Sequence, residues 1–162
     1  MIGIKHGPRD WLLTKFNTTG AVNALYSRAK VSRKYDVPDL AGYAENGQDF
    51  YIDKDCPKEL DYMGKKIDVD KFLILHEEVE LALIKMLHLI YQDCHQIACL
   101  AEKEGVEMEC GMSAWEPYSE FMRKQIDMAW NKKNPQVPPN LYKKPYVDER
   151  EHAKLKQMGY LK

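Results

Sequence analysis

The sequence predicts a mainly helical α+β fold in which a small antiparallel β element precedes a buried helix. Residues 69–104 contain neither glycine nor proline, and apolar side chains recur through them at helical spacing. Residues 48–69 instead carry a short apolar run and a turn signal, which are typical of strands. Hydrophobic residues make up 44% of the 162 residues, so the chain can bury a sizeable core.

The first third of the chain is predicted to be helical. Residues 11–16 form a short apolar segment, and apolar residues recur at helical spacing over residues 21–34. Pro38 ends this second helix, because proline disfavours helix in the residue that precedes it.

Two or three short strands are predicted over residues 48–69. Residues 50–52 form an apolar run, and residues 62–67 can form a hairpin that turns at Met63 and Gly64. These strands form the small antiparallel element that precedes the buried helix.

The central helix is predicted over residues 69–104. Asp68 or Asp70 can cap its start, and Gly105 can close its end. Its apolar side chains lie on nearly all sides of the helical wheel, which is typical of a helix that is buried rather than amphipathic.

A further helix is predicted to open with a capping box formed by Ser113 and Glu116, in which each side chain bonds the other residue's backbone. One face of this helix is apolar and carries Trp115, Tyr118, Met122, Ile126 and Ala129.

The C-terminal part is predicted to be an extended strap over residues 131–145, followed by a short helix over residues 149–158. The strap is rich in proline, which favours extended backbone. Its prolines are Pro135, Pro138, Pro139 and Pro145. We therefore expect one globular domain over residues 1–130, with a strap and helix over residues 131–162 packing on it.

Composition excludes several classes of protein. Basic and acidic residues are balanced at 24 to 25, which argues against a dedicated nucleic-acid binder. The most apolar stretch, residues 72–91, is interrupted by charges, so no membrane span is predicted. No signal peptide is visible, and the cysteines form no CxxC pair. We expect a cytoplasmic protein with reduced, buried thiols, although a disulfide or a cysteine zinc site stays open. The cysteines are Cys56, Cys94, Cys99 and Cys110.

Three polar residues on the central helix carry the chemistry. His76 and Glu80 lie one helical turn apart, and Glu77 projects to the adjacent side. Burying an imidazole and two carboxylates is unfavourable unless something pairs with them, and a divalent cation would do so. With His95 as a third ligand, the set of two nitrogens and one carboxylate suits a single zinc ion with an open position for water. Glu77 is then placed to act as general base.

This ligand set requires the helix to break. In one straight helix His76 and His95 would lie about 28 Å apart, at about 1.5 Å per residue. The chain must therefore bend between Leu87 and His95, and Asp93 could cap the second helix.

Two further residues are candidates for supporting roles. Tyr91 could donate to an oxyanion, although an ordinary core tyrosine is the main alternative. Glu102 lies on the helical face of His95, two turns away, where it could support a ligand through a hydrogen bond or replace one.

The pattern resembles that of the zincin metallopeptidases, whose active helix carries HExxH with a third ligand downstream. Here the motif is HExxE, from His76 to Glu80, and the later ligand is His95, so two positions of a His₂Glu set are exchanged. The segment at residues 51–54 and the spacing from Tyr91 to His95 are similar to those of small, mostly uncharacterised bacterial and phage proteins. The resemblance covers about residues 50 to 105. At Cys99 many zincins of this kind carry a carboxylate instead.

The resemblance implies a zincin-like fold and the zinc-dependent hydrolysis of a peptide or protein. It also implies a strand beside the active helix that holds an extended peptide by edge pairing.

Two other functions remain open. The same fold could serve a non-catalytic interaction or structural protein of phage or mobile-element type, with or without a structural metal. A catalytic site keeps an exchangeable water, whereas a structural site is closed by a fourth protein ligand. Less favoured is a nucleic-acid accessory protein that uses the lysines of the strap. The oligomeric state is not predicted.

Overall fold

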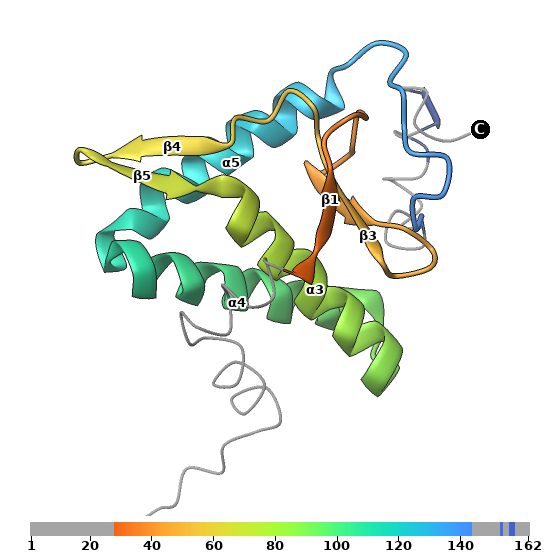
Figure 1. Cartoon of the computed structure of the whole chain (residues 1–162), viewed down its shortest axis with the longest axis horizontal. Helices are drawn as coiled ribbons and strands as arrows, with labels where there is room; N and C mark the ends of the chain where they lie inside the picture. Colours follow the sequence, from red (N-terminus) through yellow and green to blue (C-terminus); the bar gives the residue numbers. More distant parts are fainter. Residues whose placement is uncertain (1–27, 144–152, 154–155, 158–162) are drawn as a thin grey trace, which may run out of the picture.

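The computed structural model describes residues 28–143 together with residues 153, 156 and 157, and confirms the mainly helical α+β class (Figure 1). The predicted helix at residues 11–16 and most of the predicted C-terminal helix lie outside the described residues. In chain order the elements are β1 (Lys30–Ser32), β2 (Ala41–Tyr43), β3 (Asp49–Ile52), β4 (Glu59–Tyr62), β5 (Lys65–Asp68), α3 (Val69–Leu87), α4 (Tyr91–Cys110), the short 3-10 helix η1 (Met112–Ala114) and α5 (Trp115–Trp130).

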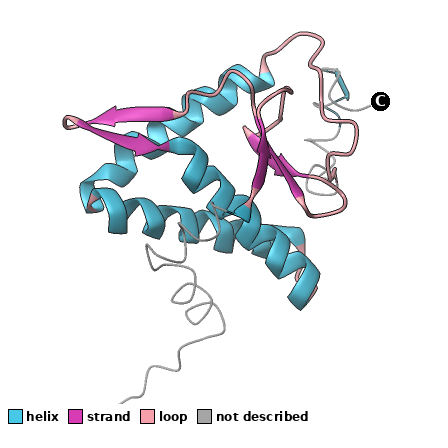
Figure 2. Ribbon diagram, in the orientation of Figure 1, coloured by secondary structure: helices cyan, strands magenta, loops and turns pink. Residues whose placement is uncertain are grey.

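The strands form two small sheets that lie apart, as Figure 2 shows. β4 and β5 form the predicted antiparallel hairpin, and its turn at Met63 and Gly64 has positive φ at both residues, as a tight hairpin requires. In the other sheet β3 is central, with β2 antiparallel on one side and β1 parallel on the other.

β1 corrects the prediction of a helix that continues to residue 34. Lys30, Val31 and Ser32 pair with residues 49–51 of β3 instead. A strand of this kind is stabilised by a partner distant in the sequence, so local helical spacing does not reveal it.

α3 and α4 form the bent pair of helices that the ligand spacing requires. α3 begins where the Asp68 side chain accepts from the Lys71 N–H at 3.1 Å, as predicted, and it ends at Leu87. His88 takes a left-handed conformation with φ of 51°, and α4 starts again at Tyr91. The bend therefore lies between Leu87 and His95, but Asp93 does not cap α4, whose start has no side-chain cap.

Two predicted helix ends are wrong. Gly105 does not end α4, which continues to Cys110; glycine stands there because α4 packs closely on Leu75 and Phe72 of α3. The capping box at Ser113 does not form, since Ser113 lies in η1 and its hydroxyl is 2.6 Å from that of Tyr62.

α5 and the strap close the other side of the molecule. The predicted apolar face of α5 is present: Tyr118, Met122 and Ala129 are buried. Residues 131–143 of the strap contain no helix, and the strap meets β2 through a bridge between Ala44 and Leu141 and a hydrogen bond from Tyr142 N–H to Tyr43 O.

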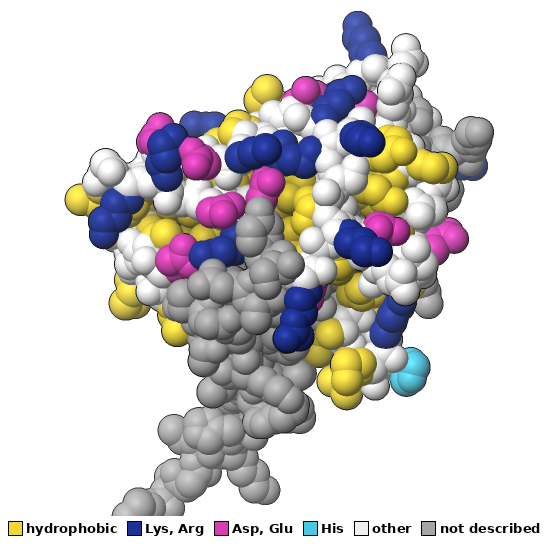
Figure 3. All heavy atoms as spheres, viewed as in Figure 1, with side chains coloured by type: hydrophobic (Ala, Val, Ile, Leu, Met, Phe, Trp, Pro, Cys, Tyr) yellow, Lys and Arg dark blue, Asp and Glu magenta, His cyan; other side chains and the backbone are white. Residues whose placement is uncertain are grey.

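Three surface and side-chain features bear on the predictions. Within the described residues, no helix is both long and apolar enough to cross a membrane. All four cysteines are free, but only Cys56 and Cys94 are buried, so the expectation of buried thiols is half right. On the face drawn in Figure 3, basic and acidic side chains are intermixed.

Candidate metal and active site

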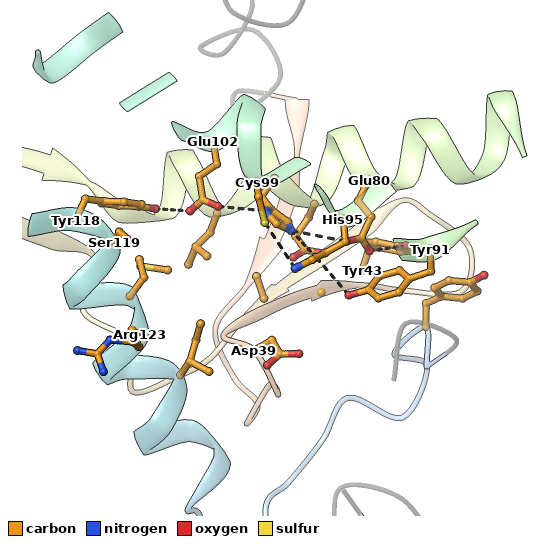
Figure 4. Close-up of a pocket in the computed structure, with 18 of the residues that line it drawn as sticks. Asp39, Tyr43, Glu80, Tyr91, His95, Cys99, Glu102, Tyr118, Ser119 and Arg123 are labelled. Atoms are coloured by element: carbon orange, nitrogen blue, oxygen red, sulfur yellow. Dashed lines mark hydrogen bonds and ion pairs between the residues drawn. The ribbon is translucent and has the colours of Figure 1, made fainter. Parts of the chain in front are cut away.

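A pocket of about 450 Å³ opens between α3, α4, α5 and β2, and the predicted site residues line it (Figure 4). α3 contributes His76, Glu77 and Glu80, and α4 contributes Tyr91, His95, Cys99 and Glu102. The bend between the two helices therefore brings together every residue that the sequence proposed for the site.

Three donor atoms form a compact triangle. His76 Nε2 lies 3.3 Å from His95 Nδ1, which lies 3.3 Å from Glu80 Oε2. Glu80 Oε2 lies 3.6 Å from His76 Nε2. Around a tetrahedral zinc ion with bonds of about 2.0–2.1 Å, neighbouring ligand atoms lie about 3.3–3.4 Å apart. The three residues therefore fit a zinc-sized cation.

Hydrogen bonds fix the orientation of His76. Tyr118 donates to Glu102 Oε1 at 2.8 Å, and the other oxygen of Glu102 lies 3.0 Å from His76 Nδ1. Because an ionised carboxylate only accepts, His76 Nδ1 carries a hydrogen, so a neutral His76 ring would offer the lone pair of Nε2 to a metal ion in the triangle. Glu102 thus supports a candidate ligand, and its two oxygens are both engaged.

The remaining candidate ligands have partners of their own. Tyr43 on β2 donates to Glu80 Oε1 at 3.2 Å, which leaves Oε2 directed at the histidines. The Tyr91 hydroxyl lies 3.3 Å from His95 Nδ1. Tyr91 therefore lies beside the triangle and is only partly buried, unlike an ordinary core tyrosine.

Glu77 differs from the other acids in having no partner. Glu77 is 8% exposed, and its side chain makes no hydrogen bond or ion pair with the described residues. Burial, with the nearby charge of Glu80, raises the pKa of Glu77 to about 8. A buried carboxylate that faces the pocket without a partner is poised to take up a proton.

The histidines and Glu80 hold one another in charged forms. Burial lowers the pKa of His76, but hydrogen bonds to Cys99 and Glu102 outweigh it and raise that pKa well above its ordinary value. Hydrogen bonds to Cys99 and Glu80 raise the pKa of His95 to about 10. Burial raises the pKa of Glu80, yet hydrogen bonds from both histidines lower it overall. The cluster therefore attracts positive charge, which a metal ion would supply in place of protons.

Cys99 is the residue that the sequence reasoning did not assign to the site. Its Sγ lies 3.6 Å from His95 Nε2, on the opposite edge of the ring from Glu80. Burial raises the pKa of Cys99, but hydrogen bonds from His76 and His95 lower it to about 7. The four-residue spacing from His95 to Cys99 on one helix was the available signal.

Two ligand sets are therefore available to a metal. His76, His95 and Cys99 could hold a metal ion, because one donor atom from each lies within 4.8 Å of the others. The set with Glu80 uses His95 Nδ1, whereas the thiol faces His95 Nε2.

Comparison with known proteins found no matching family model, no matching curated protein and no matching solved structure. Asp39 and Tyr43 also line the pocket, and unlike Cys99 they carried no sequence signal. Asp39 and Tyr43 come from before and within β2, and only the packing of β2 on α3 brings them to the histidines.

Proposed function

We propose that the protein is a zinc-dependent hydrolase of metallopeptidase type, with zinc held by His76, Glu80 and His95 and with Glu77 as general base. The observation that carries this proposal is the donor triangle with sides of 3.3, 3.3 and 3.6 Å beside an unpartnered buried carboxylate. A bound zinc ion would supply Lewis acidity, polarising a carbonyl and lowering the pKa of water.

The chain's own residues supply the proton transfers. Glu77 follows His76 directly and faces the same pocket, so its carboxylate can accept a proton from water and return it to a leaving amine. Glu102 and Tyr118 hold His76 in the tautomer that presents Nε2. Tyr43 does the same for Glu80 by occupying its other oxygen.

The strap covers one end of the outer edge of β2 through the bridge between Ala44 and Leu141, and the other end, at Ala41, favours a peptide as substrate. Asp53 N–H donates to Leu40 O and Ala44 N–H donates to Asp49 O, so residues 40, 42 and 44 pair with β3. In an antiparallel pair the alternate residues, here Ala41 and Tyr43, turn their backbone N–H and C=O groups to the other edge of the strand. Of these, Tyr43 O accepts from Tyr142 N–H. Ala41 lines the pocket and can pair with an extended chain.

Glu77→Gln tests this proposal. Glutamine keeps the size of the side chain but cannot accept the proton, so we expect the variant to keep its zinc and to hydrolyse peptides at least about 100-fold more slowly. The measurement combines metal analysis with the rate of cleavage of a mixed peptide library. Glu78→Gln is the matched control, because Glu78 is the next residue and does not line the pocket. If Glu77→Gln loses zinc instead, Glu77 is a ligand and the proposal is wrong.

Cys99 favours a second candidate function, a structural metal centre without catalysis. Such a centre would use His76, His95 and Cys99, one donor atom of each lying within 4.8 Å of the others, in place of the set with Glu80. Cobalt substitution distinguishes the two, because a cobalt–thiolate bond absorbs strongly in the near ultraviolet. Under the catalytic proposal this absorption is absent and Cys99→Ala keeps the metal. A band that Cys99→Ala removes and Cys110→Ala retains favours the structural centre.

A further inference from the structure

Asp39 is an acid of the pocket that the proposed hydrolysis does not use. It lies directly before β2, and both Asp39 and Leu40 have positive φ, at 56° and 74°. Trp130 Nε1–H donates to Asp39 Oδ1 at 2.7 Å, which anchors the carboxylate on α5. Figure 4 shows Asp39 across the open middle of the pocket from His95 and Tyr43.

The second oxygen of Asp39 has no hydrogen-bond partner among the described residues. Within residues 28–143, the one hydrogen bond of the Asp39 side chain is the bond from Trp130, and no ion pair forms with it. Arg123 lines the same pocket from α5, yet it does not pair with Asp39. Glu80 and Glu102 differ, because each has both oxygens engaged.

The pocket therefore presents an anchored acceptor that forms no ion pair with the described residues. Burial raises the pKa of Asp39, so its ionised form gains from a positive charge placed beside the free oxygen. The complementary group is a primary ammonium, which offers several N–H donors in a small volume.

We propose that Asp39 binds the primary ammonium group of the substrate, so that the pocket selects peptides by a free amine close to the bond that is cleaved. This inference rests on the proposed function. The ammonium is held and does not react: water oxygen bonds to the carbonyl carbon, the carbon–nitrogen bond breaks, and the proton passes to the departing amine. The amine can be the peptide's N-terminus or a lysine side chain.

The size and lining of the pocket agree with a short segment of peptide. A volume of about 450 Å³ lies in the range of about 300–1,000 Å³ that small-ligand sites occupy. Leu73, Met122 and Ile126 add apolar wall that can receive an aliphatic side chain next to the amine.

The test measures binding and hydrolysis separately on the zinc-loaded full chain. The binding probes are leucinol, N-acetyl-leucinol and 1-aminobutane, which carry an α-amine, a blocked amine and a lysine-like amine. The hydrolysis probes are Leu-Ala-Ala and its N-acetyl form. Asp39→Asn is the test variant, since asparagine tolerates positive φ and can still accept from Trp130. Asp127→Asn, on the exposed side of α5, is the matched control.

We expect leucinol or 1-aminobutane to bind at least about ten-fold more tightly than N-acetyl-leucinol, with the difference lost in Asp39→Asn and kept in Asp127→Asn. The tighter of the two amines assigns the source of the ammonium. Equal binding of free and blocked amines, no binding of either, or discrimination that survives Asp39→Asn would overturn the inference. If neither peptide is hydrolysed, the proposed function fails while the binding measurement still decides the role of Asp39.

Discussion

At the scale of single residues, Glu102 determines how well His76 can serve as a ligand. Its carboxylate is the acceptor for His76 Nδ1–H at 3.0 Å and is itself held by Tyr118 at 2.8 Å. Carboxylates in this position make a histidine ligand more basic and fix its ring, and their loss typically lowers metal affinity.

Glu102→Gln is therefore expected to weaken zinc binding by about 10- to 100-fold while leaving the fold intact. The glutamine can still bond Tyr118 and His76, but it lacks the negative charge. Competition with a chelator of known affinity measures the effect. Glu104→Gln, two residues away and outside the pocket, should bind zinc as the wild type does. Unchanged zinc affinity in Glu102→Gln would show that His76 is not a ligand or does not need this support.

Some residues of the pocket could be predicted from the sequence and others could not. His76, Glu77 and Glu80 could be proposed because their spacing on one helix is local, and His95 because it completes a zinc-ligand set if the chain bends. Asp39 lies far from them in the chain, and it enters the pocket only through the pairing of β2 with β3 and the packing of β2 on α3. Such contacts leave no periodic signal.

At the scale of elements, the close packing of α3 on α4 sets the distance between the ligands. A Cβ at Gly105 would lie 2.9 Å from Leu75 Cδ2 and 3.3 Å from Phe72 Cε1, and both of these side chains are fully buried. Glycine at this position therefore lets the two helices approach.

Gly105→Ala should push the helices apart even though alanine is the better helix former. We expect the free energy of unfolding of the metal-free protein to fall by about 1–2 kcal/mol, since overpacking outweighs the helix propensity gained. Zinc affinity should fall as well, because His95 moves with α4. Denaturant unfolding measures the first effect, with Glu104→Ala as the control. A more stable Gly105→Ala protein would contradict this account of the packing.

The bend between these helices illustrates how far sequence prediction extends. No glycine or proline marks residues 88–90, so propensity alone predicts one continuous helix. The requirement that His76 and His95 share an ion predicted the bend instead. The hairpin at Met63 and Gly64 was predictable from its turn, whereas β1 was not, because its stability comes from pairing with β3.

At the scale of the whole molecule, Lys132 joins the strap to the sheet that carries β2. Its Nζ lies 2.9 Å from Asp36, 2.6 Å from Asp53 and 2.8 Å from Asp55. Burial alone would raise the pKa of Asp36, but hydrogen bonds from Gln136 N–H and from Lys132 outweigh it and lower that pKa.

Lys132→Met should lower the free energy of unfolding at pH 7 by about 2–3 kcal/mol, because it removes the cation that the buried carboxylates of Asp36 and Asp53 share. A carboxyl with a lowered folded pKa stabilises the protein above its ordinary pKa of 3.8, and this contribution is lost as pH falls through the lower folded value. The difference between variant and wild type should therefore shrink below about pH 4. Denaturant unfolding across pH measures it, and the exposed Lys133→Met should behave as wild type. A difference that does not change with pH would contradict the assignment.

The metal content of the purified protein tests the central claim most directly. Protein prepared without added metal should contain close to one zinc ion per chain, and His76→Ala should abolish it, since His76 Nε2 is one corner of the donor triangle. His88→Ala is the control, because His88 lies at the helix bend and outside the pocket. A metal-free protein whose thermal stability does not change when zinc is added would contradict the account.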